Sequence, residues 1–259
     1  MKNIDAYKLE MIAIIGMLLS HTAYAFWDMF PQIARLALTG AGGVAFITTA
    51  FLLVEGYRYT SNLKRYMIRL LMFGLIATPF HIMVIGLPEA NILFSLAAGL
   101  GILWLREELK HRWLFWVIFV VLIIPVSFMT LEFYAFGVTT ILLYHTIKNE
   151  KARRIVPPIF LGLSMIMLGQ AGLFQISMYE AADLALPQYS TGIFRNAHFP
   201  LNADFLATTV PMGIVIMLCS LLTLSYNGQR GKKSKYKMWF YWVYPGHLAL
   251  LAILAFLLT

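Results

Sequence analysis

Long apolar stretches recur along this 259-residue chain and constrain its fold more than any other feature. They run for roughly 18 to 22 residues, which matches the ~20 helical residues needed to cross ~30 Å of hydrocarbon. Charged residues make up 12% and hydrophobic residues 60% of the chain, whereas soluble domains average about 25% charged and about 45–50% apolar. A soluble fold could not hide this much apolar surface, so the sequence predicts an integral membrane protein.

We expect an all-α integral membrane protein with a bundle of about nine transmembrane helices. The predicted spans are 9–27, 41–57, 67–87, 91–105, 113–130, 132–147, 155–178, 206–226 and 238–258. The first span is expected to stay in the protein, because no small-residue cleavage site stands out and further spans follow. We therefore predict one transmembrane domain over 1–259, with an extracytoplasmic loop at 179–205 and a basic cytoplasmic loop at 227–237.

The connections between the spans alternate in charge. One side receives 18 of the 20 lysines and arginines, which lie in the N-terminus (Lys2 and Lys8) and in 58–69, 106–112, 148–154 and 230–237. The positive-inside rule makes this side cytoplasmic, so the N-terminus is predicted in the cytoplasm and the C-terminus outside. The net charge of +8 is then explained by topology. It predicts contact with membrane lipids and no nucleic-acid partner.

Two histidines lie inside predicted spans. His21 comes about 13 residues after Lys8, roughly 20 Å from the inner boundary at 1.5 Å per residue. A neutral imidazole at that depth can take a proton from an amine or a hydroxyl. His247 follows Pro245-Gly246, which we expect to break or kink the last helix. The alternatives are an inert interfacial His21 and a His247 that relieves packing strain.

The segment from Glu55 to Leu71 gathers cations, hydroxyls and an amide at the cytoplasmic end of two helices. Such a mixture suits a phosphate-rich ligand, with arginine as a planar fork and lysine as a point charge. The candidate binding residues are Arg58, Thr60, Asn62, Lys64, Arg65, Tyr66 and Arg69. Anionic lipid headgroups are the competing explanation for this segment.

Other polar residues are open to two interpretations. Asn91 follows Pro88 at the outer start of a span, so it is either a helix N-cap, the commoner case, or a site residue. His81 and Glu132 are similarly ambiguous, and Cys219 is interpreted as a small hydrophobe. The chain contains no HExxH, paired-cysteine, Walker-type or GxSxG element. We therefore expect no metal.

The order of these elements resembles the TraX family, membrane proteins named after the conjugative F-pilin N-acetylase. The resemblance extends over 9–251 and is carried by LEMIAIIGMLLSH, VAFITTAFLLVEGYRYTSNLKRYMIRLLMFGLIATPF, NILFSLAAGLG and FYWVYPGHLALL. His21 corresponds to the family histidine, His247 to its C-terminal YPxHL motif, and Arg58, Thr60, Asn62, Tyr66 and Arg69 to its cytoplasmic motif. The chain departs from the family at Ser20, where an Asp is usual, and at Gly43 and Ile47, where an Arg and a Pro are frequent.

The resemblance implies a multi-pass protein of the bacterial cell membrane that transfers acetyl from acetyl-CoA. The cytoplasmic cations would hold the CoA phosphates, and His21 would act as general base or acetyl carrier. His247, Tyr57 or Asn91 would hydrogen-bond the developing oxyanion. Because Ser20 supplies no charge to orient His21, we expect either an acceptor that differs from pilin or an orienting role for Glu55 or another residue.

Several functions stay open on the sequence. The leading acceptor is the N-terminal amine of a pilin-like or other small peptide, and a cell-surface glycan hydroxyl is the enzymatic alternative. A proton-coupled transporter that uses His21 and His247 as a relay is a different class. A scaffold for pilus or peptide assembly without chemistry is the third.

Overall fold

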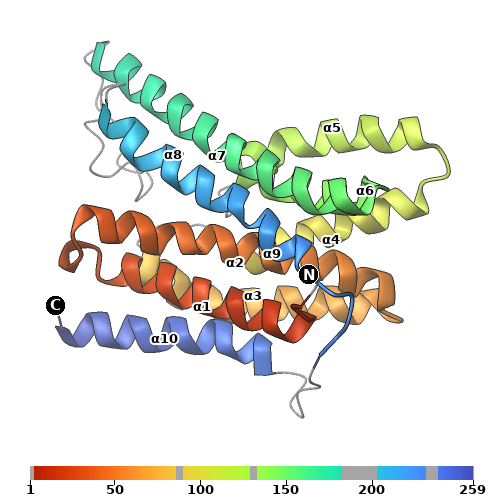
Figure 1. Ribbon diagram of the computed structural model, residues 1–259, viewed down its shortest axis with the longest axis horizontal. Helices are drawn as coiled ribbons and strands as arrows, with labels where there is room; N and C mark the ends of the chain where they lie inside the picture. The colour runs from red at the N-terminus through yellow and green to blue at the C-terminus, as the bar shows by residue number, and fades with distance from the viewer. Residues whose placement is uncertain (1–2, 86–89, 129–132, 182–202, 232–238, 259) are drawn as a thin grey trace.

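The structure is a computed structural model that describes residues 3–85, 90–128, 133–181, 203–231 and 239–258. Helices make up almost all of this part, and Figure 1 labels them: α1 (Ala6–Ala25), the 3-10 turn η1 (Trp27–Met29), α2 (Gln32–Tyr59), α3 (Leu63–Ile85), α4 (Ile92–Glu108), α5 (Arg112–Phe128), α6 (Tyr134–Thr146), α7 (Glu150–Ala181), α8 (Ala203–Leu218), α9 (Ser220–Leu224) and α10 (Trp239–Leu258). Every predicted span falls on a helix, although 206–226 is divided between α8 and α9 at Cys219. The all-α prediction is confirmed.

The prediction of a membrane protein is confirmed in general terms, but its details are not. Within the described ranges, α2, α3 and α10 are long and apolar enough to cross a membrane. The count of nine crossings and the side on which each terminus lies stay predictions. Of the predicted outer loop, 179–181 belong to α7 and 203–205 to α8, while 182–202 and residues 232–237 of the basic loop lie outside the described residues.

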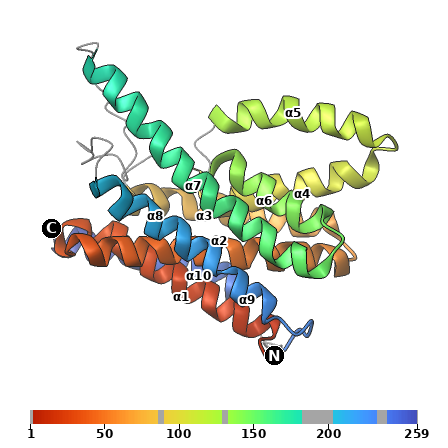
Figure 2. The same ribbon diagram turned by 45° about the horizontal axis from the view of Figure 1, so that its top comes forward.

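Helix α2 lies at the centre of the bundle. Its most apolar stretch is 61% buried, against 33% for the corresponding stretches of α3 and α10. It packs against α1, α4, α6 and α8. Figure 1 shows α1, α2, α3 and α10 running side by side, with α7 and α8 slanting across them. Figure 2 shows that α5 stands apart at one edge.

Glycines allow the central helices to approach closely. A Cβ at Gly16 of α1 would lie 2.6 Å from the carbonyl oxygen of Ala41 of α2. A Cβ at Gly162 of α7 would lie 2.5 Å from the carbonyl oxygen of Gly213 of α8. Lipid tails are as apolar as leucine, so membrane helices associate largely through such close van der Waals packing. These glycines therefore fix the spacing of both helix pairs.

A buried arginine fastens α7 to the end of α2. Arg153, with 2% of its surface exposed, donates to Glu55 at 2.7 Å and to Glu150 at 3.0 Å. Burial alone would lower the pKa of the Arg153 guanidinium, but the hydrogen bonds to Glu55 and Glu150 raise it above its ordinary value. A buried charge that lost its partner would be strongly destabilising, so Glu55 has a structural role here.

We expect Gly162→Ala to destabilise the protein, because its methyl group would push α7 away from α8. Overpacking of this kind costs about 1–3 kcal/mol. Thermal unfolding of the purified protein in detergent measures the effect. Gly101→Ala in α4 is the matched control, because its Cβ would have only Met67 nearby, at 3.8 Å. Equal unfolding temperatures for the two variants would contradict the proposed role of the glycine contact.

Candidate functional site

Three histidines from three helices meet inside the bundle. His21 of α1, His81 of α3 and His247 of α10 have 4%, 2% and 7% of their surfaces exposed. The His21 ring lies 4.9 Å from the His247 ring and 6.1 Å from the His81 ring, measured between ring centroids. Tyr244, one turn before His247, lies 5.9 Å from His21. The sequence indicated His21 and His247 separately, and the structure brings them together.

His21 and His247 share a short hydrogen bond, and its direction follows from a second bond. The Nδ1 of His21 lies 2.7 Å from the Nε2 of His247, and the Nδ1 of His247 lies 2.9 Å from the carbonyl oxygen of Val243. A carbonyl only accepts, so His247 carries its proton on Nδ1. The Nε2 of neutral His247 must then accept from the Nδ1 of His21. This arrangement leaves the lone pair of His21 on its Nε2.

The hydrogen-bonded chain explains how His21 is oriented without an aspartate. The Ser20 hydroxyl donates to the carbonyl oxygen of Met17 in its own helix at 3.0 Å. Glu55, the substitute expected from the sequence, is bound to Arg153 instead. The imidazole of His247 thus fixes the tautomer of His21. Of the break or kink expected at Pro245-Gly246, the break is absent, because α10 is continuous from Trp239 to Leu258. The kink stays a prediction.

Sequence reasoning left His81 ambiguous and did not connect Tyr244 with the histidines. Their membership of the cluster depends on how α3 and α10 pack against α1. The one signal in the sequence was that His81, like His21, is an ionisable residue inside an apolar span. Among the described residues, no three histidines, cysteines or acids are arranged to hold a metal ion.

The polar groups of the other two candidate catalytic residues are engaged in other hydrogen bonds. Asn91 caps α4 by accepting from the Leu93 N–H at 3.1 Å, and its amide donates to the Gly74 carbonyl of α3 at 2.9 Å. Asn91 is therefore the N-cap of α4, as the capping interpretation predicted, and it also joins α4 to α3. Tyr57 donates to Glu107 at 2.6 Å. It lies 15 residues along α2 from Gly42, which faces Ser20, so about 22 Å of helix separates it from the level of the histidines.

The candidate phosphate-binding residues do not form one cluster, because some form a turn and others face different helices. Thr60 and Asn62 form the turn between α2 and α3, where Asn62 accepts from the Arg65 N–H at 2.8 Å. Arg58 faces α7 and pairs with Glu55 at 3.5 Å. Arg69 faces α10, with its guanidinium 5.9 Å from the Tyr241 ring centroid. Lys64 and Arg65 are exposed, and neither has an ion pair within the described part of the chain.

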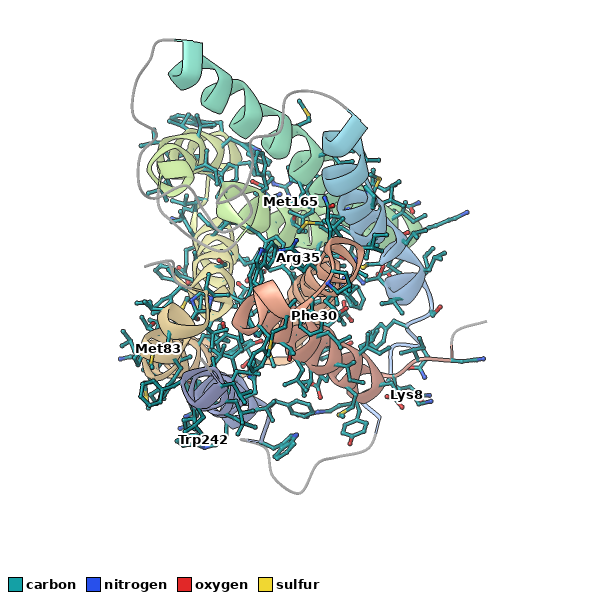
Figure 3. The ribbon with its side chains drawn as sticks, turned by 90° about the vertical axis from the view of Figure 1, so that its left-hand side faces the viewer. Lys8, Phe30, Arg35, Met83, Met165 and Trp242 are labelled. Atoms are coloured by element: carbon teal, nitrogen blue, oxygen red, sulfur yellow. The ribbon has the colours of Figure 1, made fainter. Side chains whose placement is uncertain are left out.

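The contact surface between α3 and α10, called the seam, extends from Arg69 toward His81 and His247. Phe73 contacts Tyr241 and Trp242 on α10, with ring centroids 5.3 and 5.1 Å apart. Figure 3 shows α10 lying against α3 at this edge, where Met83 and Trp242 are labelled. Tyr66, one turn before Arg69, is partly buried and packs against the same core. Along α3, Arg69 and His81 are 12 residues apart, about 18 Å of helix.

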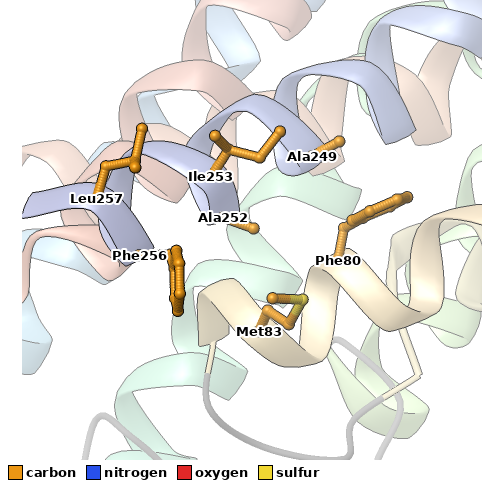
Figure 4. A pocket seen from close by; sticks show the side chains of 7 residues that line it. All are labelled: Phe80, Met83, Ala249, Ala252, Ile253, Phe256 and Leu257. Carbon is orange, nitrogen blue, oxygen red and sulfur yellow. The ribbon is translucent and has the colours of Figure 1, made fainter. Parts of the chain in front are cut away.

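An apolar cavity of about 340 Å³ lies between α3 and α10. It is lined by Phe80, Met83, Ala249, Ala252, Ile253, Phe256 and Leu257, and by none of the three histidines. Figure 4 shows Phe80 and Met83 on α3 and the other five side chains along α10. The cavity is large enough for a small ligand group, and its wall offers no charge.

Comparisons with known proteins agree with this arrangement of motifs. Residues 6–255 match the family model described as TraX protein. The chain is also 34% identical, over 128 residues, to "Probable fimbrial assembly protein FimC, serogroup H1" of Dichelobacter nodosus. That match covers 41% of this chain and 49% of the relative, so the chain spans about half of the relative's length. No solved structure matches. Because the family match extends over nearly the whole chain, this protein belongs to the TraX family.

Proposed function

We propose that this chain is a membrane acetyltransferase that moves acetyl from cytoplasmic acetyl-CoA to an acceptor amine. The acceptor in this proposal is the N-terminus of a pilin-like or other small peptide. Membership of the TraX family and the relative described as a fimbrial assembly protein support a pilus-related role. The observation that carries the chemistry is the hydrogen-bonded chain from Val243 through His247 to His21, because it leaves His21 a lone pair for proton abstraction.

The donor is proposed to lie along the seam of α3 and α10. Arg69, with the exposed Lys64 and Arg65 near it, would hold the phosphates at the cytoplasmic end. The pantetheine arm would then run past Phe73 toward His21, over about 18 Å of helix. Arg58 has no part in this route, because it faces α7 and is paired with Glu55.

The reaction needs one proton transfer through His21. The acceptor nitrogen attacks the acetyl carbonyl carbon, so that a C–N bond forms while the C–S bond to CoA breaks. The Nε2 of His21 takes the proton from the amine and returns it to the CoA thiolate, which leaves as the thiol. His247 holds the imidazole in position throughout. Tyr57 and Asn91 are left out of the mechanism, since their polar groups are bound elsewhere.

A cell-surface hydroxyl remains the alternative acceptor, because the same base would activate it. The transporter alternative has weaker support, since the chain of His21 and His247 ends on the Val243 carbonyl, which cannot pass a proton on. Acetyl-CoA turnover with a free-amine peptide, compared with an N-terminally blocked peptide and a sugar, separates these acceptors. Uptake coupled to protons but independent of acetyl-CoA would refute the enzyme.

His21→Ala is expected to lower the rate of acetyl-CoA turnover by about 10²- to 10⁴-fold, because the general base is removed. The measurement is thiol release by the protein in lipid nanodiscs with a free-amine peptide. His111→Ala is the control, since His111 is exposed at the start of α5, and it should stay within about twofold of wild type. Wild-type protein that neither binds nor turns over acetyl-CoA would refute the proposal.

His247→Leu is expected to lower kcat by about 10²-fold with little change in the KM for acetyl-CoA, because His247 orients His21 without holding the donor. His247→Gln supplies an amide oxygen that can accept from His21 and should recover part of the loss. If both variants unfolded at similarly lowered temperatures and His247→Gln recovered none of the lost kcat, His247 would have a structural role alone.

Arg69→Gln is expected to raise the KM for acetyl-CoA about tenfold with kcat nearly unchanged, because one phosphate contact is worth about 1.5–3 kcal/mol. Arg58→Gln removes the same charge 11 residues away, on the face toward α7, and should change KM less than about twofold. If the two variants behaved alike, the route along α10 would be wrong.

A further inference from the structure

The end of α4 and the start of α5, together called the α4–α5 turn, include Arg106, which has no acidic partner within the described part of the chain. Arg106 stacks on two aromatic rings of α5, with its guanidinium carbon 5.1 Å from the Phe115 centroid and 5.6 Å from the Trp116 centroid. Its Nη1 is buried and has no hydrogen-bond partner within the described part of the chain. A buried donor of this kind costs free energy unless a ligand satisfies it. The geometry therefore presents an unused charged donor.

A second arginine is close to the first. Burial of the guanidinium and, secondly, the nearby cation of Arg112 lower the pKa of Arg106. The neighbouring acid Glu107 is already engaged by Tyr57 and His145, and Glu108 is exposed. Arg112 also begins α5, and the N-terminal turn of a helix favours anions. Two repelling guanidiniums beside a helix start are stabilised by a shared anion.

The surface next to these arginines is apolar and aromatic. Trp113 and Trp116 are 66% and 46% exposed, and the same helix continues with exposed valines at Val117, Val120 and Val121. Exposed tryptophan is typical of the boundary between hydrocarbon and headgroups. A free phosphate would use only the arginines, whereas a phospholipid would use both the cations and the apolar face of α5.

We propose that the α4–α5 turn binds the phosphodiester headgroup of an anionic phospholipid. Arg106 and Arg112 contact the phosphate, and the exposed face of α5 lies along an acyl chain. The site is separate from the histidine cluster, so it stands or falls independently of acetyl transfer. It also gives α5, which packs only lightly against the rest of the bundle (Figure 2), a partner within the bilayer.

Thermal unfolding of the purified full chain in detergent tests this site. Phosphatidylglycerol is titrated against phosphatidylcholine with the same acyl chains. A ligand that binds only the folded state raises its unfolding temperature in proportion to occupancy. We expect phosphatidylglycerol to raise the unfolding temperature by several degrees more than phosphatidylcholine does. We expect Arg106→Gln to lose at least half of that difference.

Arg35→Gln is the matched control, because Arg35 also stacks on a tryptophan, Trp27, with its guanidinium carbon 5.0 Å from the ring centroid. It lies near the start of α2, away from the α4–α5 turn, and should keep the full difference. Arg112→Gln is the second variant in case Arg106→Gln fails to fold, and it should also reduce the difference. Three results would overturn the proposal. The two lipids could raise the unfolding temperature equally, or the Arg35 and Arg106 variants could lose the same part of the difference between the lipids. Inorganic phosphate could also raise the unfolding temperature as much as phosphatidylglycerol does.

Discussion

The close packing of α1 against α2 is the constraint on which the rest of the structure depends. Within a bilayer, helices gain little from hiding apolar surface, so small residues that let backbones approach determine which helices pair. Gly16 lies against Ala41, and Gly42 lies against Ser20. Gly43 also receives Ile216 from α8, which leaves no room for the larger residue frequent in the family at this position. The position of His21 follows from this packing.

The histidine pair solves an electrostatic problem that the membrane imposes. A buried carboxylate beside His21 would have to be desolvated, and this is costly in hydrocarbon. The chain from His21 through His247 to the Val243 carbonyl contains no formal charge, yet it fixes the tautomer as a carboxylate would. Pro245, near this point, does not interrupt α10. The sequence motif around His247 thus acquires a physical role, which is to orient a second histidine.

Hydropathy was enough to locate the helices, because the length of an apolar run reports directly on a spanning segment. It also indicated His21 and His247, since ionisable groups in apolar runs stand out. The pairing of these residues could not be predicted, because it depends on α10 packing beside α1 and α3, although His21 and His247 are 226 positions apart in the chain. For the same reason, the sequence could not show that Arg58 and Arg69 face different helices. Both belong to one basic segment, but the turn at Thr60 and Asn62 directs them to different neighbours.

The burial of the three histidines bears on how little basicity His21 needs. An amine that reaches His21, of which only 4% is exposed, would lose its hydration, and desolvation lowers the pKa of an amine by disfavouring its charged form. The acceptor would therefore reach His21 already neutral and nucleophilic. The base then has only to remove the proton released as the C–N bond forms, when the nitrogen is most acidic. A neutral histidine pair is sufficient for that step, so on the proposed function the absence of an aspartate at Ser20 is compatible with catalysis.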